Sequence, residues 1–107
     1  MGDANPTITV SPRISTLLTQ VTKTPDLETA LWDILSEYVD LKIKLLGERV
    51  RAFESKWRMS FKEFSKHCKS ETLEQSSYAY EVESDFWEWE EAETLLRHYE
   101  VLKAKWM

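Results

Sequence analysis

The chain has 107 residues and a net charge of −5, from 14 Lys and Arg against 19 Asp and Glu. A chain of this length forms one small domain, or a small domain with an arm, so a large enclosed catalytic cleft is not expected. The single cysteine excludes an intramolecular disulfide, and the longest apolar runs are three residues, too short for a membrane span or a signal-peptide core. We therefore expect a cytoplasmic protein that does not bind a membrane.

Negative charge is concentrated towards the C-terminus. Residues 71–107 contain ten acidic and three basic residues, whereas residues 58–70 carry a net charge of +3. Between Glu81 and Glu93 there are seven acidic residues and no basic one. This asymmetry predicts two kinds of partner. We expect an N-terminal region for dimerisation and DNA binding (residues 1–57) and an acidic, aromatic, helical region that binds a partner (residues 58–107).

The N-terminal segment predicts a short strand followed by a short helix. Residues 7–10 alternate between polar and apolar and are all β-branched, which is typical of a strand. Ser11 and Pro12 then read as an N-cap and a first helical residue. Apolar side chains recur at helical spacing, which predicts an amphipathic helix over residues 12–22, with Ile14, Leu17, Leu18 and Val21 on one face.

A long central helix is the main expected element. Thr24 and Pro25 repeat the start signal, and apolar residues then recur in two rows as far as Trp57. The two rows make an apolar face wider than one small chain can cover. We therefore expect a homodimer. Gly47 lies within this helix and marks a kink, marks a close contact or is simply tolerated.

Two further helices are predicted after the central one. Ser60 and Glu63 have the spacing of a capping box, and Met59 and Phe64 that of a hydrophobic staple, so a helix should cover residues 61–69. A polar loop is expected over residues 70–77. Residues 78–83 alternate in polarity and are either a short extended segment or the start of a helix. Ser84 or Asp85 can cap a last helix whose apolar stripe runs to the C-terminus. The expected fold is mainly α, with the long central helix, shorter helices and a short N-terminal strand.

No motif for catalysis or for a cofactor is present. His67 and Cys68 are adjacent on a predicted helix, so their side chains diverge and do not form a nucleophile–base pair. Glu63 and His67 are spaced to share a metal ion, but two ligands are too few for a site, and a capping glutamate beside a surface histidine explains them better. We expect no enzyme activity, no metal and no cofactor.

The order of elements over residues 7–38 resembles a ribbon–helix–helix domain. In that family two chains pair their strands into a ribbon that enters the DNA major groove. The resemblance implies that Thr7 and Thr9 face the bases, that Arg13 adds positive charge and that Thr24 contacts a phosphate at a helix start. The alternative is that residues 7–10 form no ribbon and the first helix simply packs on the long one.

Two other segments, residues 57–64 (WRMSFKEF) and 80–90 (YEVESDFWEWE), resemble short helical proteins encoded beside small toxin genes in bacterial and archaeal two-gene operons. This resemblance implies an antitoxin of a type II toxin–antitoxin system, which neutralises a basic toxin and represses its own operator. If the toxin is a ribonuclease, carboxylates would stand in for RNA phosphates in its active site. The candidate partner-binding residues are Tyr80, Glu83, Asp85, Phe86, Trp87 and Glu90.

The sequence leaves open which tryptophans belong to the core and which to a contact surface, because aromatic residues are prominent in protein cores and in protein interfaces. Trp89 fits the helical stripe, whereas Phe86 and Trp87 do not fit the same face. Two other functions remain open. One is a helical adaptor or structural protein without a role in nucleic-acid binding, and the other is a metal-dependent enzyme that uses the acidic cluster.

Overall fold

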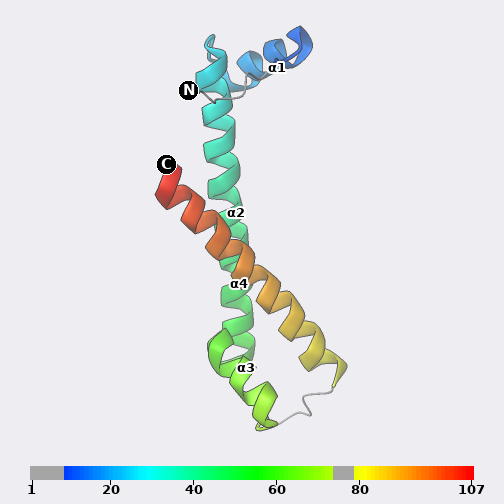
Figure 1. Ribbon diagram of the computed structural model, residues 1–107. Coiled ribbons are helices and arrows are strands. Elements are labelled where there is room, and N and C mark those ends of the chain that lie inside the picture. Colours follow the sequence, from blue (N-terminus) through cyan, green and yellow to red (C-terminus); the bar gives the residue numbers. More distant parts are fainter. Residues whose placement is uncertain (1–8, 74–78) are drawn as a thin grey trace. The chain divides into compact units, whose positions relative to one another are not determined.

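The structure is a computed structural model, and it describes residues 9–73 and 79–107. This part of the chain contains four α-helices, which are α1 (Pro12–Thr22), α2 (Leu27–Trp57), α3 (Phe61–Ser70) and α4 (Tyr80–Trp106) (Figure 1). It contains no β-strand, and the prediction of a mainly α fold is confirmed. None of these helices combines the length and the apolar character that a bilayer crossing requires.

The predicted N-terminal strand is not formed where the structure describes it. Thr9 and Val10 have no regular secondary structure, and Thr7 and Ile8 lie outside the described residues. A two-stranded ribbon forms between two chains, because an isolated strand leaves its backbone groups without partners. The structure contains a single chain and does not test this pairing, so the ribbon–helix–helix arrangement stays a prediction.

Helices α1 and α3 begin where the sequence predicts. The Ser11 Oγ accepts a hydrogen bond from the Ile14 N–H at 3.3 Å, and Pro12 is the first residue of α1. At α3 the Ser60 Oγ accepts from the Glu63 N–H at 3.2 Å, while the Glu63 Oε1 accepts from the Ser60 N–H at 3.3 Å. These bonds satisfy amides that a helix start otherwise leaves unpaired, so both N-cap predictions are confirmed.

Helix α2 begins slightly later than its start signal suggests. Thr24 and Pro25 precede it, and the Asp26 carboxylate accepts the Thr29 N–H at 3.0 Å. The helix then continues through Gly47 to Trp57. A Cβ at Gly47 would meet only the guanidinium of Arg51, at 3.3 Å from Nη1, so no backbone contact requires glycine at this position.

The start of α4 differs from the prediction. The helix begins at Tyr80 with Ala79 as N-cap, and no side chain caps it. Ser84 and Asp85 therefore lie inside the helix, and the predicted cap at these positions is wrong. Asp85 has the right spacing to Glu88 for a cap, but its carboxylate is bound instead by side chains from the end of α2.

Contacts divide the chain into two units, residues 1–38 (unit 1) and residues 39–107 (unit 2). Helix α2 begins in unit 1 and ends in unit 2. This division follows from packing, whereas the predicted regions 1–57 and 58–107 were drawn from charge and expected role. The assignment of roles to those two regions stays a prediction.

Unit 2 has a core between the last part of α2 and the helices α3 and α4 (Figure 1). One cluster joins Leu46 and Val50 of α2 to Ala92 of α4. The other contains Phe64, Val82 and Trp89, which are fully buried, and partly buried aromatic residues pack against it, namely Phe53, Trp57, Phe61 and Phe86. Helix α4 thus covers one apolar row of α2 within unit 2.

Candidate functional site

Trp87 and Trp89 lie on different sides of α4, and this separates core from surface. Trp89 is 0% exposed and stacks on Phe53 at a centroid distance of 5.5 Å. Trp87 is 62% exposed. Residues two apart on a helix point about 200° apart, so one of the two had to face away from the core. Trp89 is therefore a core residue, and Trp87 is available to a partner.

Four of the residues predicted to bind a partner share one side of α4. Tyr80, Glu83, Trp87 and Glu90 are spaced by three or four residues, which aligns them along a helix. Tyr80 is 85% exposed, Glu83 and Trp87 are exposed, and Glu90 is half-buried. We call these four residues the acidic aromatic face.

Asp85 and Phe86 lie away from this face. The Asp85 side chain is buried and binds two residues of α2, with its Oδ2 at 2.6 Å from the Lys56 Nζ and at 2.9 Å from the Trp57 Nε1. Phe86 is half-buried and packs on Phe61 at a centroid distance of 5.4 Å. Asp85 could reach a partner only by leaving Lys56 and Trp57, so we place it in the support of α4 rather than on its outer face.

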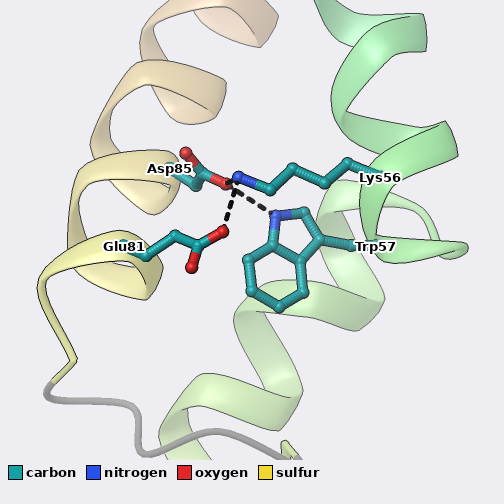
Figure 2. A network of polar contacts seen from close by, with 4 residues as sticks. All are labelled: Lys56, Trp57, Glu81 and Asp85. Atoms are coloured by element: carbon teal, nitrogen blue, oxygen red, sulfur yellow. Dashed lines mark hydrogen bonds and ion pairs between the residues drawn. The ribbon is translucent and has the colours of Figure 1, made fainter.

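Figure 2 shows how Lys56 joins this support. Its ammonium group lies between two carboxylates of α4, at 2.6 Å from Asp85 and 2.9 Å from Glu81. The sequence gives no sign of this network, because the pair Lys56 and Trp57 is more than twenty positions from Glu81 and Asp85, and no local spacing links the two pairs. Trp57, Glu81 and Asp85 belong to segments that the sequence singled out, but for other reasons.

The network also determines how much negative charge remains unpaired. Lys56 engages Glu81 and Asp85, two of the seven acids between Glu81 and Glu93. The other five form no ion pair with any cation in the described part of the chain. These are Glu83, Glu88, Glu90, Glu91 and Glu93. The α4 helix therefore presents carboxylates without a direct ion pair beside Trp87. Nearby cations offset part of this charge, because Glu90 and Glu93 line a cavity with Lys62, Lys66, Lys69 and Arg97.

A groove of about 330 Å³ runs beside the acidic aromatic face, between α3 and α4. Val82, Phe86 and Trp87 provide its apolar lining, and Phe86 and Trp87 meet edge to face at a centroid distance of 5.4 Å. Its polar lining comes from Lys69, Glu71 and Glu83, and Cys68 of α3 also lines it. An apolar wall with charged rims is the arrangement that suits a protein side chain entering from a partner.

Lys56 makes a testable contribution to alkaline stability. Its hydrogen bonds to Asp85 and then to Glu81 raise the pKa of Lys56 above the usual value for lysine. A raised pKa in the folded state means that this stabilisation is present below the unfolded-state pKa and is lost as the pH rises past about 10.5 through the folded pKa. We expect urea denaturation at increasing pH to show this loss in the wild type.

The Lys56→Met variant should lack that component of the alkaline loss. Lys62→Met is the matched control, because Lys62 is an exposed lysine of α3 and forms no ion pair within the described residues. An identical alkaline profile for the Lys56→Met and Lys62→Met variants would contradict the role of Lys56.

The candidate nucleic-acid residues are spread over unit 1. Thr9 and Arg13 are exposed, Thr24 is half-buried in the turn before α2, and Thr7 lies outside the described residues. At the start of α2, the Thr29 amide already donates to the Asp26 carboxylate, which would itself repel a phosphate. Residues 9–38 contain two basic and four acidic side chains, an excess of negative charge that repels a phosphate backbone.

The residues considered for chemistry have structural partners instead. The Glu63 Oε1 accepts hydrogen bonds at the start of α3, and the His67 Nδ1 lies 2.5 Å from the Thr72 Oγ1. Burial raises the pKa of the Cys68 thiol, the opposite of what activates a cysteine nucleophile. Among residues 9–73 and 79–107, no three His, Cys, Asp or Glu side chains gather in a group able to hold a metal ion.

No known protein family, curated protein or solved structure matches this chain.

Proposed function

We propose that this protein is a non-enzymatic binding protein whose acidic aromatic face contacts a basic protein. The observation that carries the proposal is the position of Trp87, which is 62% exposed and stands beside Glu83 and Glu90, carboxylates that form no ion pair among the described residues. Tryptophan is enriched among the residues that dominate interface energies, and uncompensated charge steers a partner of opposite sign.

The partner that we propose is a small basic toxin, as the resemblance of residues 57–64 and 80–90 to operon-encoded antitoxins suggests. The acidic aromatic face would lie over the toxin's positively charged surface. If the toxin cleaves RNA, carboxylates such as Glu83 and Glu90 would occupy positions that RNA phosphates take. In this proposal the chain acts as a homodimer, and the segment around Thr9, Arg13 and Thr24 contacts operator DNA.

A second candidate function is that of a helical adaptor without nucleic-acid binding. The excess of acidic over basic side chains in residues 9–38 favours it, because DNA binding requires positive charge. A gel-shift assay with the DNA upstream of the chain's own gene separates the two candidates. Binding that is weakened by Arg13→Ala supports a regulator, and an unshifted band supports the adaptor.

The binding proposal is tested by co-expressing the chain with the product of the adjacent gene and measuring the affinity of the complex. We expect Trp87→Ala to weaken the complex at least about ten-fold, because a central aromatic anchor contributes more than about 1.4 kcal/mol. Trp106→Ala is the matched control, since Trp106 is similarly exposed (65%) but lies at the far end of the same helix.

Salt dependence provides an independent measurement on the same complex. Rising ionic strength should weaken binding, and Glu83→Gln combined with Glu90→Gln should reduce that dependence. The proposal fails if no complex forms at low salt. It also fails if the complex forms but responds neither to salt nor to Trp87→Ala.

A further inference from the structure

Unit 1 buries little of its apolar surface in the described residues. Ala30 is the only buried residue among residues 9–38, and α1 buries none of its eleven residues. Six large apolar side chains in this unit are 48–62% exposed. Three lie along one side of α1 and three lie along the beginning of α2, and they are Ile14, Leu17, Val21, Trp32, Leu35 and Tyr38.

A unit with this burial does not hold itself together. Helices shorter than about 12–15 residues are marginal in water without tertiary packing, and α1 has 11 residues. Domains below about 40 residues usually need a disulfide, a metal or oligomerisation, and unit 1 ends at residue 38 without a cysteine. Without a cysteine, unit 1 cannot form a disulfide, and a metal would be an added ligand. Of the three means, oligomerisation is the one that the chain can provide by itself.

We infer that the two helices of unit 1 dock against the same two helices of a second copy of this chain. Helix α1 carries one charged residue, Arg13, whereas residues 27–38 of α2 carry three acidic ones, Glu28, Asp33 and Glu37. Like-charge repulsion is therefore lowest where α1 of one copy packs on the beginning of α2 of the other. Depletion of charge at the centre of a contact, with apolar and aromatic residues enriched, is characteristic of interfaces between copies. Two-fold pairing also uses one surface for both partners, which is the commonest arrangement of homo-oligomers.

The exposed area is sufficient for such a contact only if both helices take part. Six half-exposed apolar side chains correspond to on the order of 500 Å² per copy. Pairing would therefore bury roughly 1,000 Å² in total, which is near the lower limit for a specific interface. Neither α1 nor the beginning of α2 supplies this area alone, so substitutions on either helix should break the dimer.

The pairing couples the folding of α1 to association. In a dimer α1 is covered and helical, and in a separated monomer its apolar face returns to water. We expect helix content, followed by circular dichroism, to fall on dilution through the range in which sedimentation shows dissociation. Unit 2 has its own buried core, and its helices should remain folded through the same dilution.

Analytical ultracentrifugation of the full-length chain tests the inference. We expect a dimer at micromolar concentrations, and we expect Leu17→Lys and Leu35→Lys each to weaken it at least about a hundred-fold. Thr16→Lys is the matched control, because it adds the same charge on the opposite side of α1 and should leave the dimer intact. Urea denaturation of unit 2 should be the same in all three variants, which excludes general unfolding.

Three results would overturn the inference. The first is a wild-type chain that stays monomeric throughout the micromolar range. The second is a dimer that resists both Leu17→Lys and Leu35→Lys and is lost only with Leu45→Lys, a half-exposed position in unit 2. The third is equal weakening by Leu17→Lys and Thr16→Lys. This inference rests on the homodimer in the proposed function. Binding of a basic partner through Trp87 uses unit 2, so failure of the dimer and failure of that binding can be told apart.

Discussion

Replacing Trp89 with alanine is expected to lower the free energy of unfolding of unit 2 by about 3–5 kcal/mol. The indole is fully buried and lies 5.1 Å from the ring of Phe64 and 5.4 Å from that of Phe61, measured between centroids. A small domain is stable by about 5–15 kcal/mol in total, so this loss would remove a large fraction of the stability of unit 2. Urea denaturation followed by circular dichroism measures it.

Trp87→Ala is the matched control for this prediction, because it removes the same side chain from the exposed side of the same helix. It should cost less than about 1 kcal/mol, since the indole is already mostly in water. Trp89→Phe should fall between the two. It keeps a ring in the core and removes an indole N–H that is buried without a hydrogen-bond acceptor among the described residues. Equal losses for Trp87→Ala and Trp89→Ala would contradict the assignment of Trp89 to the core.

Asp85→Ala is expected to be the next most damaging change, with a loss of about 2–3 kcal/mol. The substitution removes the acceptor of the Trp57 Nε1–H and one of the two carboxylates that hold Lys56. The half-buried indole N–H then lies unpaired, and α4 loses its polar attachment to the end of α2. The same urea denaturation gives the value.

Two other acidic residues of α4 serve as comparisons for Asp85. Glu88→Ala removes an exposed carboxylate without an ion pair among the described residues, and should change stability by no more than about 0.5 kcal/mol. Glu81→Ala breaks an ion pair between exposed side chains, and should cost less than about 1 kcal/mol. A loss for Asp85→Ala as small as that for Glu88→Ala would show that the network does not hold α4.

The helices could be predicted from the sequence because their signals are local. Apolar spacing placed the central helix, and the side chains of Ser11 and Ser60 marked two helix starts within a few residues of the amides that they bind. The start of α4 was not predicted correctly, because local signals are misleading there. Ala79 provides no side-chain cap, whereas Asp85 has capping spacing but takes part in a contact 28 residues away, with Trp57.

The candidate site could be predicted only in part. Sequence reasoning found the acidic segment and its aromatic residues, but it left open whether Trp87 or Trp89 belongs to the core. The helical stripe placed Trp89 and Trp87 on different sides of the helix. Whether the side of Trp89 is covered depends on where α3 and the end of α2 lie against α4, and the sequence pattern does not contain this information. Lys56 was missed altogether, because an exposed-looking lysine at the end of an amphipathic helix gives no sign of its distant carboxylate partners.

The distribution of the five tryptophans allows each unit to be followed separately by tryptophan fluorescence. Trp32 is the only tryptophan of unit 1 and is 48% exposed, whereas Trp57 and Trp89 lie in or against the core of unit 2. Indole emission shifts with the polarity around the ring. A chain that keeps Trp32 alone, with phenylalanine at the other four positions, would therefore report on unit 1 without an attached dye, and one that keeps Trp89 alone would report on the core of unit 2.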